Sequence, residues 1–480
     1  MTTETVTQHF IAGEWRAGDG PALDDLNPAN GQSLASVPTG TAEEVDAAVT
    51  AARRAFDGGW ANSTPQERRK LLLRLSQLLA EDVMEISRIS TEEMGMPHGI
   101  SMGEILYAAE YLEYFAGWAD KIHGEVIPVV APGVFDYTLR EPIGVVAAII
   151  PWNAPVTLAI SKLAPALAAG NAVVLKPSEL APLAPLRLAE LVAKAGFPRG
   201  VVNVVTGDGT TGQALVEHPG VDRIAFTGGS ETGRKIGAIA VRNLKPVSLE
   251  LGGKSANLVF ADADLNAAAL SAATGIFLNT GQACLAGSRL LVEAPIADAF
   301  VEKVSAAARG MVVGDPFQPG TVMGPVISEG SLNRILGMVE EARGSAEVVL
   351  GGERLGGELS GGYFLPPTIL TGVSNDQPIA REEVFGPVLS VIPFTDEAEA
   401  IAIANDTRYG LAGGVWTTNL SRAHRLAKAI RAGTVWVNTW LLVNPGTPFG
   451  GYKDSGLGRE GGQQALHSYL ETKNVYVQLD

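Results

Sequence analysis

The chain has 480 residues, of which 46% are hydrophobic and 18% are charged, a balance typical of a globular protein and not of a disordered one. Its 36 basic and 52 acidic residues give a formal net charge of −16. Binding to nucleic acid or to an anionic membrane needs clustered Lys and Arg, and no basic tract occurs in this acidic chain. We therefore expect neither a nucleic acid nor a membrane as partner.

The chain has one cysteine, Cys284, which excludes an internal disulfide and any zinc site with two or more thiolates. The six histidines are scattered without ligand spacing, so we expect no metal site. The first residues lack the basic and apolar regions of a secretory signal. The longest apolar stretch, 144–152, is about half the length of a membrane span. These features predict a soluble, cytoplasmic protein.

The first 120 residues predict mainly helices, because apolar residues recur there at a spacing of three or four. The expected helices cover 42–56, 65–91 and 101–118. Thr64 followed by Pro65 is a typical helix start, with a hydroxyl cap and a proline in the first turn.

From Gly144 short β-branched runs alternate with helical segments. Strands are expected at 144–150, 172–175, 201–205, 223–226 and 246–250, and helices at 156–169, 182–195, 211–217 and 232–241. This alternation predicts a doubly wound parallel sheet. Polar and glycine-rich turns follow the strands at 177–178, 207–209 and 228–230, where such a sheet binds its ligand.

A second α/β unit is predicted from about residue 253. Its strands are expected at 256–260, 290–292, 389–393 and 433–437, and its helices at 265–278, 297–308, 331–342, 397–404 and 420–430. Two strand-like segments, 124–140 and 474–479, fit neither unit. Isolated strands can be covered by the sheet edge of another subunit, so we expect a homo-oligomer.

Cys284 lies in a polar segment bounded by Gly281 and Gly287. A single cysteine is often a small buried hydrophobe, but this polar and glycine-bounded setting favours a nucleophile.

Glu250 and Asn153 each follow a predicted strand. The Glu250 carboxylate could act as a general base facing a pocket, or it could form an ion pair with Lys254. The Asn153 amide could cap the following helix or donate to an oxyanion.

Two further segments are candidates for nucleotide binding. Residues 228–233 could cradle a phosphate, although they do not form the G-x-G-x-x-G fingerprint. Lys176 and Glu179 could contact ribose and phosphate, or they could belong to a solvated turn.

Taken together, these segments closely resemble the NAD(P)-dependent aldehyde dehydrogenase superfamily. Ten blocks match in the order of the family and run through nearly the whole chain: 10–15, 27–31, 141–146, 151–153, 176–179, 226–228, 250–254, 281–284, 382–387 and 448–451. The catalytic glutamate and cysteine of the family match Glu250 and Cys284, which are 34 residues apart.

The resemblance implies oxidation of an aldehyde to the free carboxylic acid. Cys284 attacks the carbonyl as a thiolate, so the site is expected to favour loss of its proton. Asn153 and the Cys284 backbone N–H hold the oxyanion, a hydride leaves to the nicotinamide, and Glu250 activates the water that hydrolyses the thioacyl-enzyme.

The resemblance also implies which residues bind the cofactor. Lys176 and Glu179 match contacts to the adenosine ribose, Glu383 matches the contact to the nicotinamide ribose, and Phe385 packs beside the nicotinamide. Because the Glu179 carboxylate would repel a 2′-phosphate, NAD is favoured, with NADP as the alternative. The full set of expected cofactor-binding residues is Trp152, Lys176, Ser178, Glu179, Gly209, Phe226, Thr227, Gly228, Gly229, Glu383 and Phe385.

Two departures from the family pattern have consequences. Gly229 stands where many relatives have serine, which removes a hydroxyl contact to the pyrophosphate. Ala154, Leu158 and Ser161 stand in a stretch where relatives acting on small aldehydes often have aromatic residues. The substrate tunnel is therefore expected to be wide and to take a medium-to-large or aromatic aldehyde.

The resemblance implies an α/β fold in three parts. These are a doubly wound NAD-binding domain (1–122 and 142–252), an α/β catalytic domain (253–453) and a small β oligomerisation arm (123–141 and 454–480). A homodimer or a homotetramer is expected. Two alternative functions stay open at this point, a CoA-acylating aldehyde dehydrogenase and a catalytically silent member of the family; ester hydrolysis by the same thiolate would be a side activity. CoA-acylating relatives generally lack the glutamate that Glu250 matches.

Overall fold

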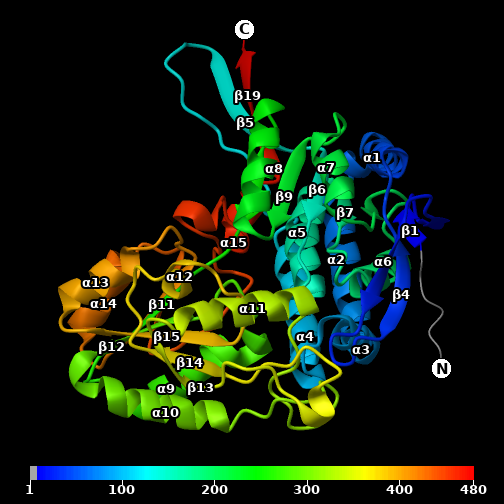
Figure 1. Ribbon diagram of the computed structural model, residues 1–480. Coiled ribbons are helices and arrows are strands. Elements are labelled where there is room, and N and C mark those ends of the chain that lie inside the picture. Colours follow the sequence, from blue (N-terminus) through cyan, green and yellow to red (C-terminus); the bar gives the residue numbers. More distant parts are fainter. Residues whose placement is uncertain (1–7, 480) are drawn as a thin grey trace.

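The computed structural model describes residues 8–479, which form two α/β units and a two-stranded arm that projects from them (Figure 1). The blue-to-green part of the chain builds the first unit, and the green-to-orange part builds the second. The α/β fold with parallel sheets expected from the sequence is confirmed.

The first sheet has eight strands, of which five central ones are parallel. Their order across the sheet is β18 (Gly456–Leu457), β10 (Val247–Glu250), β9 (Arg223–Thr227), β6 (Val145–Ile149), β7 (Ala172–Lys176), β8 (Val202–Val204), β1 (Gln8–Ile11) and β2 (Glu14–Ala17). The five parallel strands are those expected from the sequence. The antiparallel edge strands β1, β2 and β18 were not expected, because strands of two to four residues give almost no periodic signal.

Helices cover both faces of the first sheet. One face packs against α1 (Ala42–Asp57), α7 (Gly209–Glu217) and α8 (Ser230–Arg242). The other packs against α2 (Pro65–Glu81), α4 (His98–Ala116), α5 (Pro155–Ala169) and α6 (Leu183–Ala195). Along β6, Val145 and Ala147 enter the first core, whereas Val146 and Ala148 enter the second. A strand buried on both faces explains the continuous apolar run in the sequence.

The prediction of a single helix over 65–91 is wrong, because the segment forms two helices. The chain forms α2 up to Glu81 and a separate α3 (Val83–Met94), with Asp82 between them at ψ 5°. The Asp82 carboxylate pairs with Arg187 on α6 at 2.6 Å. This contact is a tertiary one, so the apolar periodicity could not show the break.

The second sheet has seven strands, all parallel except β13. Their order is β13 (Glu347–Leu350), β14 (Thr368–Thr371), β15 (Val388–Phe394), β12 (Arg289–Glu293), β11 (Ala256–Val259), β16 (Ala412–Trp416) and β17 (Thr434–Val437). Helices α9 (Leu265–Phe277) and α10 (Ala297–Arg309) cover one face, and α13 (Glu397–Asn405) and α14 (Leu420–Ala429) cover the other. Helices α11 (Glu329–Ala342) and α12 (Pro378–Arg381) pack beside β14 and β15.

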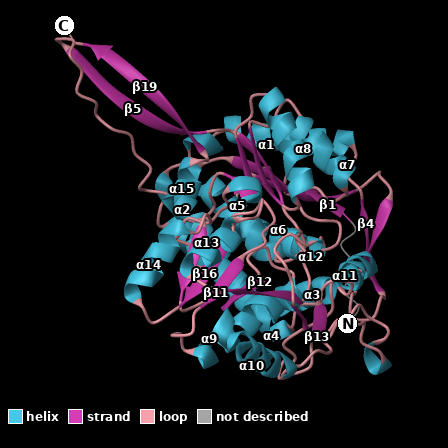
Figure 2. Ribbon diagram, turned by 60° about the vertical axis from the view of Figure 1, so that its left-hand side comes forward, coloured by secondary structure: helices cyan, strands magenta, loops and turns pink. Residues whose placement is uncertain are grey.

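The arm consists of β5 (Val134–Pro142) and β19 (Leu470–Gln478), which pair antiparallel along their whole length and project from the body (Figure 2). These are the two segments that fitted neither unit. Residues 454–469 were expected in the arm, but they pack on the first unit. In this segment β18 pairs with β10, and α15 (Gly462–His467) packs against α5. We keep the three-part division as a proposal and assign 454–469 to the first unit. A further small sheet, β3 (Ala22–Leu26) with β4 (Ser33–Pro38), lies beside that unit.

The topology of the first sheet fixes where a ligand can bind. After β6 the chain continues through β7 and β8 on one side and then returns to place β9 on the other side of β6. A doubly wound sheet has its crevice at such a reversal, at the carboxyl ends of the strands. Asn153 follows β6 and Gly228 follows β9, so both lie at that crevice.

Within residues 8–479, no helix is long and apolar enough to cross a membrane.

Candidate active site

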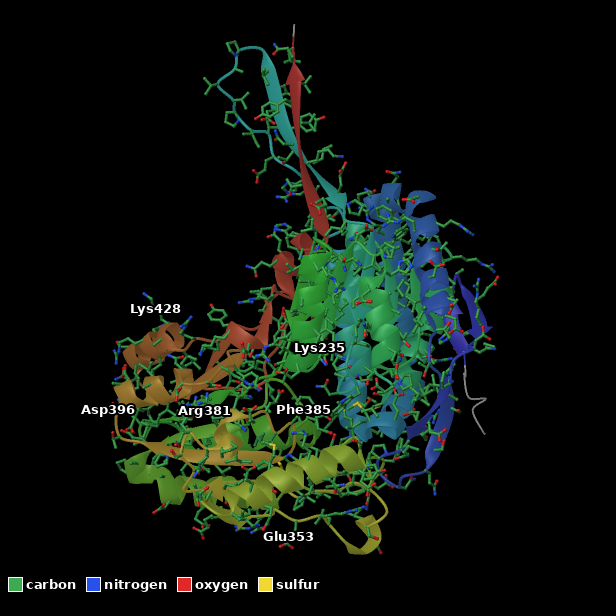
Figure 3. The ribbon with its side chains drawn as sticks, turned by 45° about the horizontal axis from the view of Figure 1, so that its top comes forward. Lys235, Glu353, Arg381, Phe385, Asp396 and Lys428 are labelled. Carbon is green, nitrogen blue, oxygen red and sulfur yellow. The ribbon has the colours of Figure 1, made fainter. Side chains whose placement is uncertain are left out.

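A cavity of about 450 Å3 lies where the two units meet, and it brings Asn153, Glu250 and Cys284 together. Glu250 is the last residue of β10, and five residues join it to β11 of the second sheet. Cys284 lies between the short helix η2 (Leu278–Gly281) and β12. Phe385, which lines the same cavity, lies where the second unit faces the first (Figure 3). Three segments that are distant in the sequence therefore share one site.

The two glycines after Glu250 allow the units to approach each other. A Cβ at Gly252 would lie 2.2 Å from an oxygen of the Glu383 carboxylate. A Cβ at Gly253 would lie 2.3 Å from the backbone carbonyl oxygen of Cys284. The contact at Gly253 is with backbone, which cannot move aside, so only glycine fits there, and the Cys284 segment lies directly against the end of β10.

Cys284 is partly exposed and faces the cavity, so it is not an inert core residue. Burial of the sulfur and the nearby carboxylates of Glu383 and Glu250 raise the pKa of the thiol to about 12. The backbone N–H groups of Cys284 and Leu285 act in the opposite direction, but their effect is smaller. The expectation that these surroundings favour the thiolate is therefore wrong for the protein alone, because two carboxylates disfavour a third negative charge.

This electrostatic arrangement predicts how the thiol reacts. Cys284 is the only cysteine, so iodoacetamide alkylation of the protein measures this sulfur alone. We expect the rate to rise with pH without a plateau below pH 10. Glu383→Gln removes a negative charge near the sulfur and should make alkylation at pH 8 about three to ten times faster, since one pKa unit changes the thiolate fraction tenfold.

Glu382→Gln is the matched control for this measurement. Glu382 is the neighbouring residue, and its carboxylate pairs with Arg408 at 2.7 Å. This variant should leave the alkylation rate close to that of the unaltered protein. Equal rates for Glu383→Gln and the unaltered protein would contradict the assigned cause.

The Asn153 side chain is directed toward the cysteine segment. Its amide nitrogen donates to the backbone carbonyl of Gln282 at 2.9 Å. The alternative role as a helix cap is wrong, because no side chain at the N-cap of α5 caps that helix. Glu104 on α4 does so instead, accepting from the Thr157 N–H at 2.7 Å. One amide hydrogen of Asn153 is left for a ligand.

The segment before Cys284 has an unfavourable backbone conformation. Asn279 and Thr280 have φ of 51° and 55°, the left-handed region that β-branched residues rarely adopt. Asn279 donates to the Asn153 carbonyl at 3.1 Å, and Thr280 donates to the Gly324 carbonyl at 2.9 Å. Surrounding contacts of this kind maintain strain at functional sites. No motif in the sequence marks these two positioning residues.

Glu250 is 3% exposed, and neither of its carboxylate oxygens has a hydrogen-bond partner among the described residues. Burial raises the pKa of Glu250 well above its usual range, and the neighbouring Glu460 carboxylate raises it further. No ion pair with Lys254 forms, so that alternative is wrong. A buried carboxyl group that faces a cavity is suited to general-base catalysis, because its basicity is raised.

A buried ion pair lies beside Glu250. The Lys162 ammonium contacts the Glu460 carboxylate and donates to the Thr227 hydroxyl at 2.6 Å. Ser161 donates to the other oxygen of Glu460 at 3.1 Å. Lys162 and Glu460 are 298 residues apart and occur in no recognised motif, so the sequence gives no signal for this pair.

The remaining cavity residues form a second part of the site near the sheet crevice. The Glu383 carboxylate accepts from the Gly253 N–H at 2.9 Å. Trp152 and Phe385 meet edge to face with their ring centroids 5.5 Å apart. Gly229 is the N-cap of α8, and a Cβ there would meet nothing within 4 Å, so the first turn of that helix is open. Thr227 and Gly228 line the same space.

Four other expected residues lie at neighbouring strand ends and do not line this cavity. Lys176 is buried at the end of β7, and its ammonium lies 3.5 Å from the Glu179 carboxylate. Ser178 accepts from the Leu180 N–H, and Gly209 begins α7 beyond β8. They continue the crevice along the sheet edge, as a long ligand would require.

The structure corrects the expectation that the Phe226 side chain contacts the cofactor. Its side chain is 5% exposed and packs in the core between the first sheet and α1, α7 and α8. A Cβ at Gly228 would lie 2.5 Å from this ring. Phe226 therefore supports the turn from below and does not present its side chain to a ligand.

Comparison with known proteins gives a consistent result. A sequence model described as "Aldehyde dehydrogenase family" matches residues 15–475. The chain is 45% identical over 474 residues to an aldehyde dehydrogenase of Emericella nidulans, which covers 98% of this chain and 95% of that protein. It is 46% identical to (Z)-2-((N-methylformamido)methylene)-5-hydroxybutyrolactone dehydrogenase of Acinetobacter baylyi, with 98% and 97% covered.

Solved structures agree. Betaine aldehyde dehydrogenase of Staphylococcus aureus, crystallised with NAD+, superimposes with a TM-score of 0.97 at 38% identity, covering 99% of this chain and 95% of that one. A putative aldehyde dehydrogenase of Burkholderia cenocepacia has the same TM-score at 47% identity, with 99% and 98% covered. The family match over nearly the whole chain, together with the shared fold, shows that this protein belongs to the aldehyde dehydrogenase family.

Proposed function

We propose that this enzyme oxidises an aldehyde to the free carboxylic acid with NAD as hydride acceptor. The observation that carries the proposal is the meeting of Cys284, Asn153 and Glu250 in one cavity between the two units. A nucleophile, an oxyanion donor and a base within one enclosed space are the groups that this reaction needs.

In the proposed mechanism, the partly exposed Cys284 thiol loses its proton to solvent, and the sulfur adds to the aldehyde carbon. The free amide hydrogen of Asn153 donates to the oxyanion that forms. The aldehyde carbon then loses a hydride and becomes a thioester of Cys284. Glu250 takes a proton from water, the hydroxide attacks the thioester, and collapse of the tetrahedral adduct releases the acid and the sulfur.

The residues at the crevice fit NAD. The open first turn of α8 presents backbone N–H groups that suit a pyrophosphate. Glu383 would hold the nicotinamide ribose beside Phe385, and Lys176 with Glu179 would hold the adenosine ribose. The bound cofactor supplies the hydride acceptor. The half-exposed Glu179 carboxylate favours NAD over NADP, because it would repel a 2′-phosphate.

An absorbance assay at 340 nm tests the function. Purified enzyme is mixed with an aldehyde panel and NAD+, NADP+, or NAD+ with CoA. We expect NADH to form without CoA, with the acid as product and higher kcat/KM for NAD+ than for NADP+. NADH formation only in the presence of CoA would indicate the acylating reaction instead, and no reduction with any aldehyde would indicate a silent protein.

We also propose that the enzyme is a homo-oligomer assembled through the arm. Phe135, Tyr137 and Leu139 on β5 share one face with Val475 and Val477 on β19, by the pairing register. Phe135 and Leu139 are about 40% exposed, so this apolar face is open in a single chain. A second copy that covers this face would bury it.

A charge on that face should weaken assembly. Val477→Glu is expected to raise the dissociation constant of the oligomer at least about tenfold, because it places an unpaired charge in an apolar interface. Sedimentation velocity over a range of protein concentrations measures the change. Asn474→Glu places the same charge on the opposite face of the same strand and should leave the assembly intact. If both variants assemble normally, the arm is not the interface.

We propose a cytoplasmic location as well. It is supported by the single, partly exposed cysteine, since a nucleophilic thiol needs a reducing compartment.

A further inference from the structure

One region of the cavity is lined by residues outside the segments that are expected to bind the nicotinamide. Its walls come from α4, from α5, from β17 and the loops that follow it, and from the segment just after Cys284. The residues that form them are mainly aromatic and aliphatic: Tyr107, Tyr111, Leu158, Leu285, Trp436 and Phe449. We refer to this region as the substrate tunnel.

Three polar groups of the tunnel wall are already bonded to protein. The Ser161 hydroxyl oxygen lies 2.9 Å from the Leu158 carbonyl oxygen and 3.1 Å from a Glu460 carboxylate oxygen, and its single hydrogen is shared between these two acceptors. The Thr157 hydroxyl donates to the Glu104 carbonyl at 3.1 Å. The indole N–H of Trp436 donates to the Leu442 carbonyl at 2.9 Å. The donor hydrogens of these three groups are therefore not left for a ligand.

Among the described residues that line the whole cavity there is no Lys, Arg, His or Asp, and the ionisable acids are Glu250, Glu383 and Glu460. A substrate carboxylate would therefore lose its water without gaining a cationic partner. A cationic substrate also gains little binding free energy from these carboxyl groups. Glu460 is already paired with Lys162, and burial together with the Glu460 carboxylate raises the pKa of Glu250, which disfavours its charged form.

We propose that the substrate is an uncharged aldehyde with an aromatic or similarly bulky apolar body, and that the tunnel rejects aldehydes that carry a carboxylate. This inference rests on the proposed dehydrogenase function. Ala154, Leu158 and Ser161 all line the cavity, so the small residues noted in the sequence do leave space there. A small aldehyde would leave part of that apolar surface uncovered.

A set of matched substrates tests the proposal with the unaltered enzyme and NAD+. 4-Methylbenzaldehyde and 4-formylbenzoate have similar shapes and differ in charge. We expect kcat/KM for the methyl compound to exceed that for the carboxylate about 100-fold, the discrimination expected when a polar group is buried without a partner. It should also exceed the values for acetaldehyde and betaine aldehyde at least about tenfold.

A variant at the tunnel mouth tests whether the lack of a cation explains the rejection of a carboxylate substrate. Val443 lines the cavity and is 46% exposed, so Val443→Arg should fold. It supplies the missing cation and should raise the carboxylate-to-methyl ratio of kcat/KM at least about tenfold. Val443→Gln is the uncharged control of similar length and should leave the ratio where it was. Leu158→Phe narrows the tunnel and should lower the ratio of 4-methylbenzaldehyde to acetaldehyde.

The outcomes separate the two proposals. Preference for 4-formylbenzoate, for betaine aldehyde or for acetaldehyde in the unaltered enzyme overturns the substrate inference and leaves the dehydrogenase function standing. An unchanged ratio in Val443→Arg overturns the electrostatic argument. Failure of every aldehyde to reduce NAD+ overturns the proposed function itself.

Discussion

Replacing Cys284 with alanine is expected to lower kcat for aldehyde oxidation at least about 10⁴-fold, since loss of a covalent nucleophile typically removes most of the rate enhancement. No other cysteine in the chain can replace this one. Steady-state NADH formation at 340 nm measures the effect. Single-turnover kinetics should show no burst, because no thioester can form.

Controls separate this loss of chemistry from loss of structure. Cys284 is partly exposed to the cavity, so truncation removes few core contacts, and the circular dichroism spectrum and thermal transition should stay unchanged. NAD+ titration followed by protein fluorescence should give a similar affinity, because Trp152 and Glu383 are intact. Activity within tenfold of the unaltered enzyme would show that the sulfur is not the nucleophile.

Replacing Glu250 with glutamine is expected to separate the two halves of the reaction. Hydride transfer should still give a burst close to one NADH per active site, whereas the steady-state rate should fall about 10²- to 10⁴-fold, the usual contribution of a general base. The acyl group then stays on Cys284, and mass spectrometry of the quenched protein should detect it. Loss of burst and turnover together would place the role of Glu250 before the thioester.

The pH dependence gives a second readout of Glu250. A base acts in its unprotonated form, and burial raises the pKa of this carboxyl well above its usual value. The kcat of the unaltered enzyme should therefore still rise with pH well above the range in which an ordinary carboxyl group titrates, and Glu250→Gln should lose that rise. Glu460→Gln removes the neighbouring negative charge, lowers the pKa of Glu250 and should move the rise to lower pH. Glu231→Gln, an exposed change on α8, should alter neither readout.

The fold was largely predictable wherever strands are buried on both faces. Continuous apolar runs such as Val145–Ile149 and Ala172–Lys176 have few other stable environments than the middle of a parallel sheet. The break at Asp82 and the edge strands β1 and β18 were not predictable, because they depend on contacts with distant partners. The role of 454–469 was missed for the same reason.

The candidate site shows the same division. Cys284, Glu250 and Asn153 could be identified from local motifs, and all three line the cavity. Lys162, Glu460, Glu104 and Asn279 carry no motif, and their importance comes from which atoms they face. The thiol pKa was expected in the wrong direction, because the number of carboxylates around a sulfur is a property of the assembled site.

The sequence by itself determined the two α/β units, the chemical groups of the site and their order along the chain, because apolar periodicity and short motifs are local properties. The tertiary structure alone decided that Asn153 faces the cysteine segment while Glu104 caps α5, that Phe226 lies in the core, and that the substrate tunnel has no cation in its wall. Each of these depends on side chains from elements far apart in the sequence. Hydrogen bonding, burial and charge act through distances in space, and only the folded chain sets those distances.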